Sequence, residues 1–529
     1  MTTVVFTRRF LYDYARNPVN LLLLVTVPTV FVVIAGGSLR DFATLLGGPG
    51  GPAVETATAG WAAAFLTGVA MYFQTAATRD TDRRVVIAGL PPRRLVAARL
   101  LTGSVLAVLA SSAALGALAV RTGINNPVRA IVGTLMFAVI YVAIGAVVGA
   151  FVGNPVNGTV IVLFVWIFDV FFGPAMGAAD RLATRGLPTH FVTLWMVDLP
   201  SGHSGRAGDL GWASAWIIGA MAGAWLLTAS RTRARQHRPG HHPAGLNAQL
   251  SAAARAAWRD SRRNHVQWAL FGVVPVVFIL TADAVTPNKP ILVTLREHGR
   301  SAAQMLSMPA VHGATMAPVA IASLAALVGM FVMLDSRDGD RRAALAGLRP
   351  GALFTARLGV LAATALAATV VSLAATALVF QPQRWATYAA ANLLIAMTYG
   401  LVGALLAPIF GRVGGVFVAF LLPFLDIGIT QSPMLHPVPT TLSRLLPGYG
   451  GSRVLLDGAL TRGFDESGPL LVGLAWLAAL LCVVALAYRR ATAPAGRAHP
   501  GTTRRYGDAT ALRPAHSPGG PSRRSERGR

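Results

Sequence analysis

Two carboxylates interrupt long apolar stretches of this 529-residue chain at nearly matched places. Asp169 lies in VIVLFVWIFDVFFGP, and Asp426 lies in FVAFLLPFLDIGITQ. A carboxylate at the centre of a membrane helix costs on the order of 3 kcal/mol on insertion scales, so it usually faces protein or water. The two aspartates could therefore bind a substrate or a proton. The alternative is that they lie near the outer ends of short helices, at the interface or capping re-entrant helices.

A charged segment occurs twice. RDTDRRVVIAGLPPRRLVAARL begins at Arg79, and RDGDRRAALAGLRPGALFTARL begins at Arg337. Thirteen of the twenty-two positions match without a gap, at an offset of 258 residues. Apolar positions at helical spacing, followed by Gly-Leu-x-Pro, predict a short helix on a membrane surface, a turn and then a new helix. Charged residues by themselves would only mark a membrane boundary. The recurrence of the same charged residues together with glycine and proline instead favours charged contacts to a docking partner.

The sequence offers little other chemistry. It lacks H-E-x-x-H, G-x-S-x-G and the P-loop pattern G-x-x-x-x-G-K-[ST], and its single lysine is Lys289. Cys482 is the only cysteine, so neither a disulfide framework nor a cysteine metal site is possible. We therefore expect no catalytic residue, no metal site and no cofactor in this chain.

The elements that position these residues must be membrane helices. The chain is 54% hydrophobic and 13% charged, with a mean hydropathy of +0.56, which is typical of polytopic membrane proteins. We predict an all-α membrane protein with about twelve transmembrane helices, at 20–38, 59–78, 96–120, 128–152, 158–175, 211–229, 266–283, 314–334, 354–380, 386–408, 414–431 and 469–488.

Arginine distribution predicts the orientation. With both termini in the cytoplasm, 33 of the 46 Lys and Arg residues fall on the cytoplasmic side, as the positive-inside rule requires. The net charge of +25 thus indicates topology and attraction to the lipid bilayer, not nucleic acid. The Arg-, Ala- and Gly-rich composition hints at a GC-rich genome, so we expect a bacterial plasma membrane. Residues 1–16 predict an amphipathic surface helix with Phe6, Phe10, Leu11 and Tyr14 toward lipid.

The twelve spans form two copies of six. RNPVNLLLLVTVPTVF at Arg16 parallels RNHVQWALFGVVPVVF at Arg263, and AIGAVVGAFVG at Ala143 parallels LVGALLAPIFG at Leu401. Both copies start on the same side, so they are parallel repeats related by an axis along the membrane normal. The expected division is a first six-helix half (1–229), a basic cytosolic linker (230–262), a second six-helix half (263–490) and a disordered basic cytosolic tail (491–529).

This order of elements resembles the permease of ABC transporters in the type-2 exporter class. In that family, the cytosolic loop after the second span is a coupling helix that contacts the ATPase subunit. The family commonly has a glutamate in this loop, where the present chain has only aspartate. Matched by position, the resemblance implies coupling roles for Asp82, Arg83, Arg84, Gly89, Leu90 and Pro92, and for Asp340, Arg341, Arg342, Gly347, Leu348 and Pro350.

The resemblance also implies a mode of action. The family places two six-span units around one pathway, and this chain supplies both, so self-dimerisation is not required. A separate ABC ATPase, in two copies, would bind ATP and Mg and dock beneath both loops, and this chain would not be an enzyme. The proline-rich loops 175–210 and 432–468 resemble the short re-entrant helices that the family places before its last span. Plain extracellular loops are the alternative.

The expected function is a permease subunit of an ATP-driven exporter that moves a lipophilic solute, such as a drug, an antibiotic or a lipid, out of the cell. Two alternatives stay open. The chain could be a proton-coupled secondary transporter that uses Asp169 and Asp426. It could also be a membrane scaffold or signalling subunit linked to an ATPase.

Overall fold

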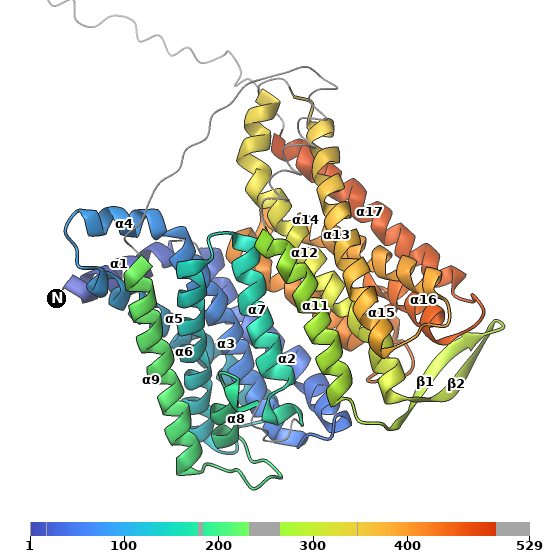
Figure 1. Cartoon of the computed structure of the whole chain (residues 1–529), viewed down its shortest axis with the longest axis horizontal. Coiled ribbons are helices and arrows are strands. Elements are labelled where there is room, and N and C mark those ends of the chain that lie inside the picture. The colour runs from blue at the N-terminus through green and yellow to red at the C-terminus, as the bar shows by residue number, and fades with distance from the viewer. Residues whose placement is uncertain (1, 17, 178–183, 232–264, 346–347, 493–529) are drawn as a thin grey trace, which may run out of the picture.

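The protein is a bundle of long helices with one small two-stranded hairpin (Figure 1). The computed structural model describes residues 2–16, 18–177, 184–231, 265–345 and 348–492. Within these ranges, nine helices are long and apolar enough to cross a membrane. The predicted all-α, polytopic class is therefore confirmed. Gly347, nearly all of the linker and nearly all of the tail lie outside the described residues.

The helices of the first half overlap the six predicted spans, but α3 and α7 are not among the nine described helices that are long and apolar enough to cross a membrane. The six spans correspond to α2, α3, α5, α6, α7 and α9. Proline is the first residue of α5, α6 and α7, where its missing N–H leaves no helical hydrogen bond unmade. In order, the elements are α1 (Thr2–Ala15), α2 (Pro18–Leu45), α3 (Gly51–Ala77), α4 (Arg79–Ile87), α5 (Pro92–Arg121), α6 (Pro127–Phe151), α7 (Pro155–Phe171), the 3-10 helices η1 (Pro174–Met176) and η2 (Thr184–Gly186), α8 (His190–Met196) and α9 (Ala207–Arg231).

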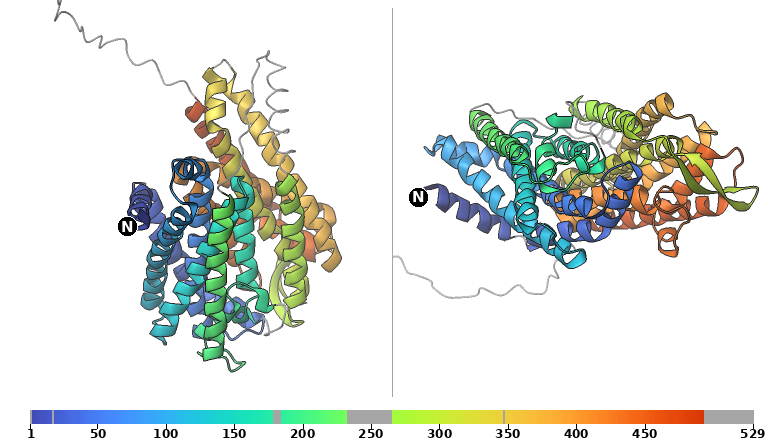
Figure 2. Two further views of the ribbon diagram at one scale, coloured as in Figure 1. Left: turned by 60° about the vertical axis from the view of Figure 1, so that its left-hand side comes forward. Right: turned by 90° about the horizontal axis from the view of Figure 1, so that it is seen from below.

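The second half lies beside the first, as the two rotated views show (Figure 2). Its predicted spans correspond to α11, α12, α13, the two arms of α14 and α17. The elements are α11 (His265–Val285), β1 (Pro290–Glu297), β2 (Arg300–Ser307), α12 (Met308–Leu345), α13 (Pro350–Val379), α14 (Trp385–Pro423), the π-helix η3 (Phe424–Thr430), α15 (Thr441–Arg444), α16 (Gly448–Leu460) and α17 (Ser467–Thr492).

α14 is a helical hairpin. Gly411 has φ 63° and ψ −162° inside the helix, a backbone conformation that favours glycine. Tyr399, before this turn, donates a hydrogen bond to Asp426, after it, so the two arms run side by side. The predicted spans 386–408 and 414–431 are these two arms.

α1 packs on protein where the sequence predicts contact with lipid. The Thr7 hydroxyl donates to a backbone carbonyl of α5 at 3.3 Å. The Phe10 ring lies 3.7 Å from the Arg99 guanidinium, while Leu11 and Tyr14 pack against the core. Burial raises the pKa of Tyr14 to about 12. The prediction that Phe10, Leu11 and Tyr14 face lipid is wrong, because the start of α5 offers this helix an arginine and an apolar surface.

The antiparallel hairpin of β1 and β2 has no counterpart in the sequence-based prediction. Its two turn residues, His298 and Gly299, both have positive φ, at 53° and 76°, as a tight two-residue turn requires. The Asp465 carboxylate accepts from their backbone N–H groups at 2.9 and 3.2 Å. A His-Gly turn is a weak sequence signal beside Asn-Gly or Asp-Gly, which is why the hairpin escapes prediction.

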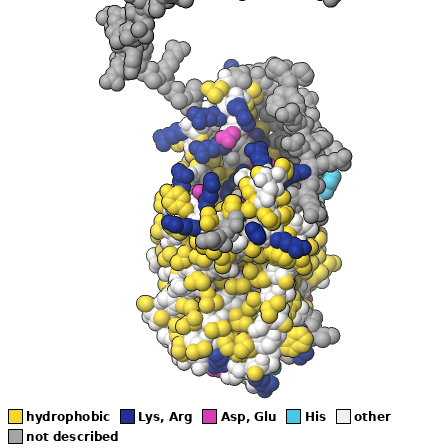
Figure 3. All heavy atoms as spheres, turned by 90° about the vertical axis from the view of Figure 1, so that its left-hand side faces the viewer, with side chains coloured by type: hydrophobic (Ala, Val, Ile, Leu, Met, Phe, Trp, Pro, Cys, Tyr) yellow, Lys and Arg dark blue, Asp and Glu magenta, His cyan; other side chains and the backbone are white. Residues whose placement is uncertain are grey.

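The surface divides into an apolar band and an arginine-rich end. On the face that Figure 3 shows, apolar side chains cover the lower part and arginines gather above them. Large apolar side chains are exposed on several helices, among them Leu22, Ile218 and Leu378. Such extensive apolar exposure is expected where lipid replaces water. The protein is therefore a multi-pass membrane protein, while its bacterial origin and the cytoplasmic position of its termini stay predictions.

The closest helix contacts recur in the two halves. A Cβ on Gly145 in α6 would overlap the Gly68 carbonyl oxygen in α3, and one on Gly403 in α14 would overlap the Ala326 carbonyl oxygen in α12. Both members of the second pair follow those of the first by 258 residues. Such contacts between small residues let helix backbones approach closely in a membrane, where no hydrophobic effect drives helices together.

Adding one methyl group at these contacts should destabilise the protein. We expect Gly145→Ala and Gly403→Ala each to cost about 1–3 kcal/mol, since a backbone cannot move aside as a side chain can. Gly116, in α5, has no atom near its would-be Cβ, so Gly116→Ala should stabilise the helix by about 0.5–1 kcal/mol. Thermal unfolding in detergent measures all three variants. Equal shifts at Gly145 and Gly116 would contradict the close approach.

Candidate functional site

The first copy of the charged segment forms a separate short helix. α3 ends at Ala77, and α4 begins at Arg79 after Thr78. Gly89, with φ 101°, lies in the turn that follows, and α5 then begins at Pro92. The predicted helix, turn and new helix are confirmed for this copy, and α4 lies across the end of the bundle in Figure 1.

The second copy is built differently. Arg337–Leu345 continues α12 without a break, so the prediction of a separate surface helix is wrong here. In the first copy, the Arg79 guanidinium donates to the Gly149 carbonyl near the end of α6, which holds the chain against the bundle. The equivalent Arg337 is exposed, and α12 extends beyond α4 in Figure 1.

One ion pair occurs in both copies. Arg99 donates to the two carboxylate oxygens of Asp82 at 2.6 and 3.1 Å, and Arg357 donates to those of Asp340 at 2.8 and 3.2 Å. Both residues of the pair recur at the offset of 258. The two aspartate side chains are only 13% and 3% exposed. Their charge is therefore paired within the bundle, while the coupling role that the resemblance implies for them stays a prediction.

Each ion pair joins a charged segment to the beginning of the next long helix. The pair of Asp82 and Arg99 connects α4 to α5, and stacking of Phe10 on Arg99 adds α1. In the second half, the Tyr488 hydroxyl donates to Asp340 at 2.7 Å and so adds α17. A bidentate, partly buried Arg–carboxylate pair sets geometry more strictly than a single contact. Movement of α4 or of the end of α12 would therefore be transmitted to α5 or α13.

The remaining predicted coupling residues include the arginines that give both segments their positive charge. Arg84, Arg341 and Arg342 are exposed and Arg83 is half-buried, so arginines cover both segments on their outer side. The other predicted coupling residues that the structure describes lie in the turns or at the first residue of the following helix, with one exposed and four half-buried, namely Gly89, Leu90, Pro92, Leu348 and Pro350.

Asp169 is buried in a hydrogen-bonded cluster. Its carboxylate accepts from the Tyr141 hydroxyl at 3.0 Å and from the Thr189 hydroxyl at 2.7 Å. The backbone N–H of Thr189 also donates to it at 3.1 Å. Thr189 directly precedes α8, so the carboxylate holds the beginning of this short helix in place.

Asp426 repeats the arrangement in the second half. Its carboxylate accepts from the Tyr399 hydroxyl, from the Gly448 backbone N–H at 2.8 Å and from the Gln431 side chain at 3.0 Å. Gly448 is the first residue of α16, and a helix beginning favours negative charge. Tyr141 and Tyr399 are again separated by 258 residues.

The two aspartates cap helices deep in the bundle. α16 runs from Gly448, near Tyr399, to Gly458, which contacts Tyr388 at the beginning of α14. Each carboxylate accepts from a backbone N–H at the beginning of a short helix, as the capping alternative describes, while the position of the two aspartates relative to the membrane interface stays a prediction. The plain-loop alternative for 175–210 and 432–468 is wrong, since α8, α15 and α16 lie there.

A cavity of about 90 Å³ lies between α2 and α7 on one side and α11, α12 and η3 on the other. Its wall is almost entirely apolar and includes seven phenylalanines, among them Phe42 and Phe278. The aspartates discussed above are not among its lining residues. The polar lining residues are His312, Thr315, Ser323, Ser38 and Ser432.

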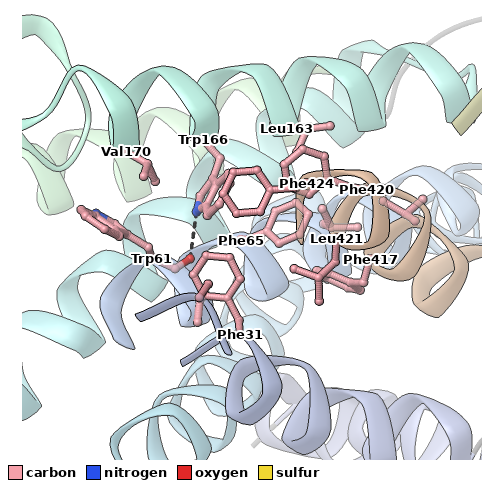
Figure 4. Packing of buried hydrophobic residues seen from close by; sticks show 14 of the residues in the cluster. Phe31, Trp61, Phe65, Leu163, Trp166, Val170, Phe417, Phe420, Leu421 and Phe424 are labelled. Carbon is pink, nitrogen blue, oxygen red and sulfur yellow. Dashed lines mark hydrogen bonds between the residues drawn. The ribbon is translucent and has the colours of Figure 1, made fainter. Parts of the chain in front are cut away.

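Aromatic rings from the two halves pack together in the core (Figure 4). Phe65 in α3 packs against Phe417 and Phe420 in α14, with ring centroids 4.8 and 5.4 Å apart. Trp166 in α7 packs on Phe65 at 4.9 Å, and its indole N–H donates to the Trp61 carbonyl at 2.8 Å. The cluster thus links the two halves at the centre of the bundle.

Several residues of these sites were not identified from the sequence. Arg99, Arg357, Tyr141 and Tyr399 bind the aspartates that were singled out. The offset of 258 could have revealed all four, because both the arginine and the tyrosine recur at it. His312 gave no such signal, since its equivalent position holds Val54.

Comparison with known families agrees with a transport role. Residues 58–230, which run from α3 to α9, match the family model described as ABC-2 family transporter protein. The match supports an ABC-2 type permease, which is a transmembrane transport component and not the ATPase. Permeases of this family generally work with ABC ATPase partners. No curated protein matches the chain.

The buried ion pair can be tested by removing one partner and then both. Asp82→Ala leaves the Arg99 guanidinium buried without its carboxylate, and we expect a loss of about 3 kcal/mol in the free energy of unfolding. Asp82→Ala/Arg99→Leu should recover most of this loss, because an apolar pair needs no compensating charge. Thermal unfolding in detergent measures both variants.

The matched control is the exposed pair of Arg412 and Asp335, whose side chains are 51% and 40% exposed. Asp335→Ala should cost less than about 1 kcal/mol, as for surface ion pairs in general. If Asp82→Ala proves as mild as Asp335→Ala, the ion pair is not the anchor described above.

Proposed function

We propose that the chain is the fused permease subunit of an ATP-driven exporter. Two six-helix halves would surround one pathway, so self-dimerisation is not required, and a lipophilic solute such as a drug, an antibiotic or a lipid would leave the cell. A separate ABC ATPase, in two copies, would bind ATP and Mg. The observation that carries this proposal is the recurrence of one anchored charged segment, held by Asp82 and Arg99 in one half and by Asp340 and Arg357 in the other.

The cavity supports a lipophilic solute. Its apolar, aromatic wall would bind an uncharged body by the hydrophobic effect and would reject an unpaired charge, whose desolvation costs several kcal/mol. Its position between the halves is where a pathway shared by two six-helix units must lie. Residues lining the cavity come from both halves, for example Leu39 and Val160 from one and Val274 and Ile427 from the other.

The two Asp–Arg ion pairs would transmit movement of the ATPase to the long helices. Closure of an ATPase dimer beneath the protein would push on α4 and on the end of α12. The two ion pairs would pass the movement to α5 and α13, because each arginine lies near the beginning of one of these helices. Separation of the halves would then part the aromatic cluster around Phe65 and open the cavity toward the cytoplasm.

Neither alternative function has comparable support. Proton coupling through Asp169 and Asp426 would require contact between these carboxylates and the pathway, yet each accepts three hydrogen bonds within the protein and lies outside the cavity wall. A scaffold or signalling subunit would need no cavity for a solute. The transport proposal accounts for both the internally hydrogen-bonded aspartates and the cavity.

Reversing charge on the outer side of both segments should abolish docking. We expect Arg83→Glu/Arg341→Glu to lose copurification with the partner ATPase, by about tenfold or more, because acidic side chains would repel a surface that attracts arginine. The control, Arg9→Glu/Arg490→Glu, changes two exposed arginines outside the segments and should leave copurification intact. Retained assembly in the first variant would refute the docking role.

Neutralising both buried aspartates should separate the two kinds of transporter. Asn keeps one acceptor oxygen, so we expect Asp169→Asn/Asp426→Asn to lower the thermal unfolding midpoint but to keep efflux of a lipophilic dye within about twofold once protein amounts are matched. Replacing the P-loop lysine of the ATPase should stop efflux. The opposite pattern, loss with the asparagines and retention without ATP hydrolysis, would favour proton coupling.

A further inference from the structure

We propose that the cavity selects apolar molecules that carry a hydrogen-bond donor, such as a lipophilic alcohol or phenol, and that His312 accepts this hydrogen bond. The inference rests on the proposed function and names the substrate class of the same cavity. It is carried by a buried histidine atom that has no partner in the described part of the protein.

His312 is the one ionisable side chain in a wall otherwise made of apolar and hydroxyl groups. It lies on α12 and is 3% exposed, with its ring 5.7 Å from that of Phe42 at an angle of 72°. Its Nε2 is buried and makes no hydrogen bond to any described residue. A buried polar atom without a partner costs about 1–3 kcal/mol, so such an atom in a cavity wall indicates a ligand that supplies the partner.

The other ring nitrogen decides what Nε2 can bind. Nδ1 is in hydrogen-bond contact with the Thr286 hydroxyl. Where that hydroxyl donates its only proton to the Ala282 carbonyl, at 2.7 Å, its oxygen is left to accept from His312. In this arrangement neutral His312 carries its proton on Nδ1, and the lone pair of Nε2 has no partner among the described residues. A ligand must meet this lone pair with an O–H or N–H group.

Ser323 adds a second polar position on the same face of α12. Its hydroxyl also lines the cavity, is buried and has no hydrogen-bond partner among the described residues. It lies eleven residues after His312, which is three helical turns or about 16 Å along the axis. Thr315, between them, already donates to the Val311 carbonyl at 3.0 Å. The spacing fits an elongated ligand with a donor at one end and a second oxygen near the other.

Two matched probes test the donor requirement on the purified full-length protein in lipid nanodiscs. 4-Nonylphenol carries an O–H group, and 4-nonylanisole has the same body without it. We expect the wild-type protein to bind nonylphenol about tenfold more tightly than nonylanisole. His312→Phe should keep nonylanisole binding and lose this preference, because it fills the site without an acceptor. His312→Gln should keep part of it, because its carbonyl oxygen can accept.

Thr286→Val provides an independent test that leaves the cavity wall intact. Without the Thr286 oxygen, Nδ1 loses its acceptor, both tautomers become populated and the preference for nonylphenol should fall. Thr315→Val and Ser323→Ala are the controls, and neither should change the ratio of the two affinities. A diol probe, 9-(4-hydroxyphenyl)nonan-1-ol, should bind more tightly than nonylphenol to the wild type but not to Ser323→Ala.

The outcomes separate this inference from the proposed function. Ala320 lines the cavity, so Ala320→Trp should block binding of every probe. If both probes bind equally to the wild type and Ala320→Trp blocks both, the donor requirement is overturned and the cavity remains a binding site. If Ala320→Trp does not block the binding of any probe, the cavity is not the solute site and the inference about His312 is wrong as well. The ATPase docking test does not depend on this result.

Discussion

The structure depends on a bidentate arginine–carboxylate pair that is made twice. An isolated carboxylate near the membrane interface would be costly, but in each half an arginine from the next helix satisfies it from two directions. The pair converts a helix-to-helix turn, which would otherwise bend freely, into a joint with a set angle. It also pairs the charge of Asp82 and Asp340 within the protein, whereas Arg84, Arg341 and Arg342 beside them stay exposed.

Polar groups deeper in the bundle are also paired with other groups of the protein. Asp169 and Asp426 are tolerable in the core because tyrosine hydroxyls and backbone N–H groups at the beginning of short helices donate hydrogen bonds to them. Each carboxylate in turn accepts from an N–H group that the beginning of a helix would otherwise leave unpaired. Where polar groups are satisfied in this way, they hold elements in place. His312 stands out because one of its ring nitrogens is hydrogen-bonded, whereas the other is buried without a partner among the described residues.

Much of this arrangement can be predicted from the sequence, since membrane helices are long, apolar and bounded by arginine and proline. The helical positions of α2, α5 and α13 follow from that pattern. The direction in which Asp82 points does not, because helical spacing alone cannot tell a bundle-facing anchor from a solvated contact. The continuation of α12 through Arg337 also could not be predicted, because the two copies of the charged segment are alike in sequence, yet only the first copy is separated from the preceding helix.

The cavity lies on one side of the bundle because equivalent positions of the two halves hold side chains of unequal size. Phe65 in α3 fills its surroundings by packing on Phe417 and Phe420. The residue 258 positions after Phe65 is Ser323, and at the near-matched offset of 257 the phenylalanines correspond to Val160 and Leu163. All three of these smaller residues line the cavity. Two identical halves would form the same cavity on both sides or on neither. Two halves of one chain can instead differ in side chain at single positions. Because the side chains at Ser323 and His312 differ from those at the equivalent positions of the first half, the two similar halves would form a single binding site.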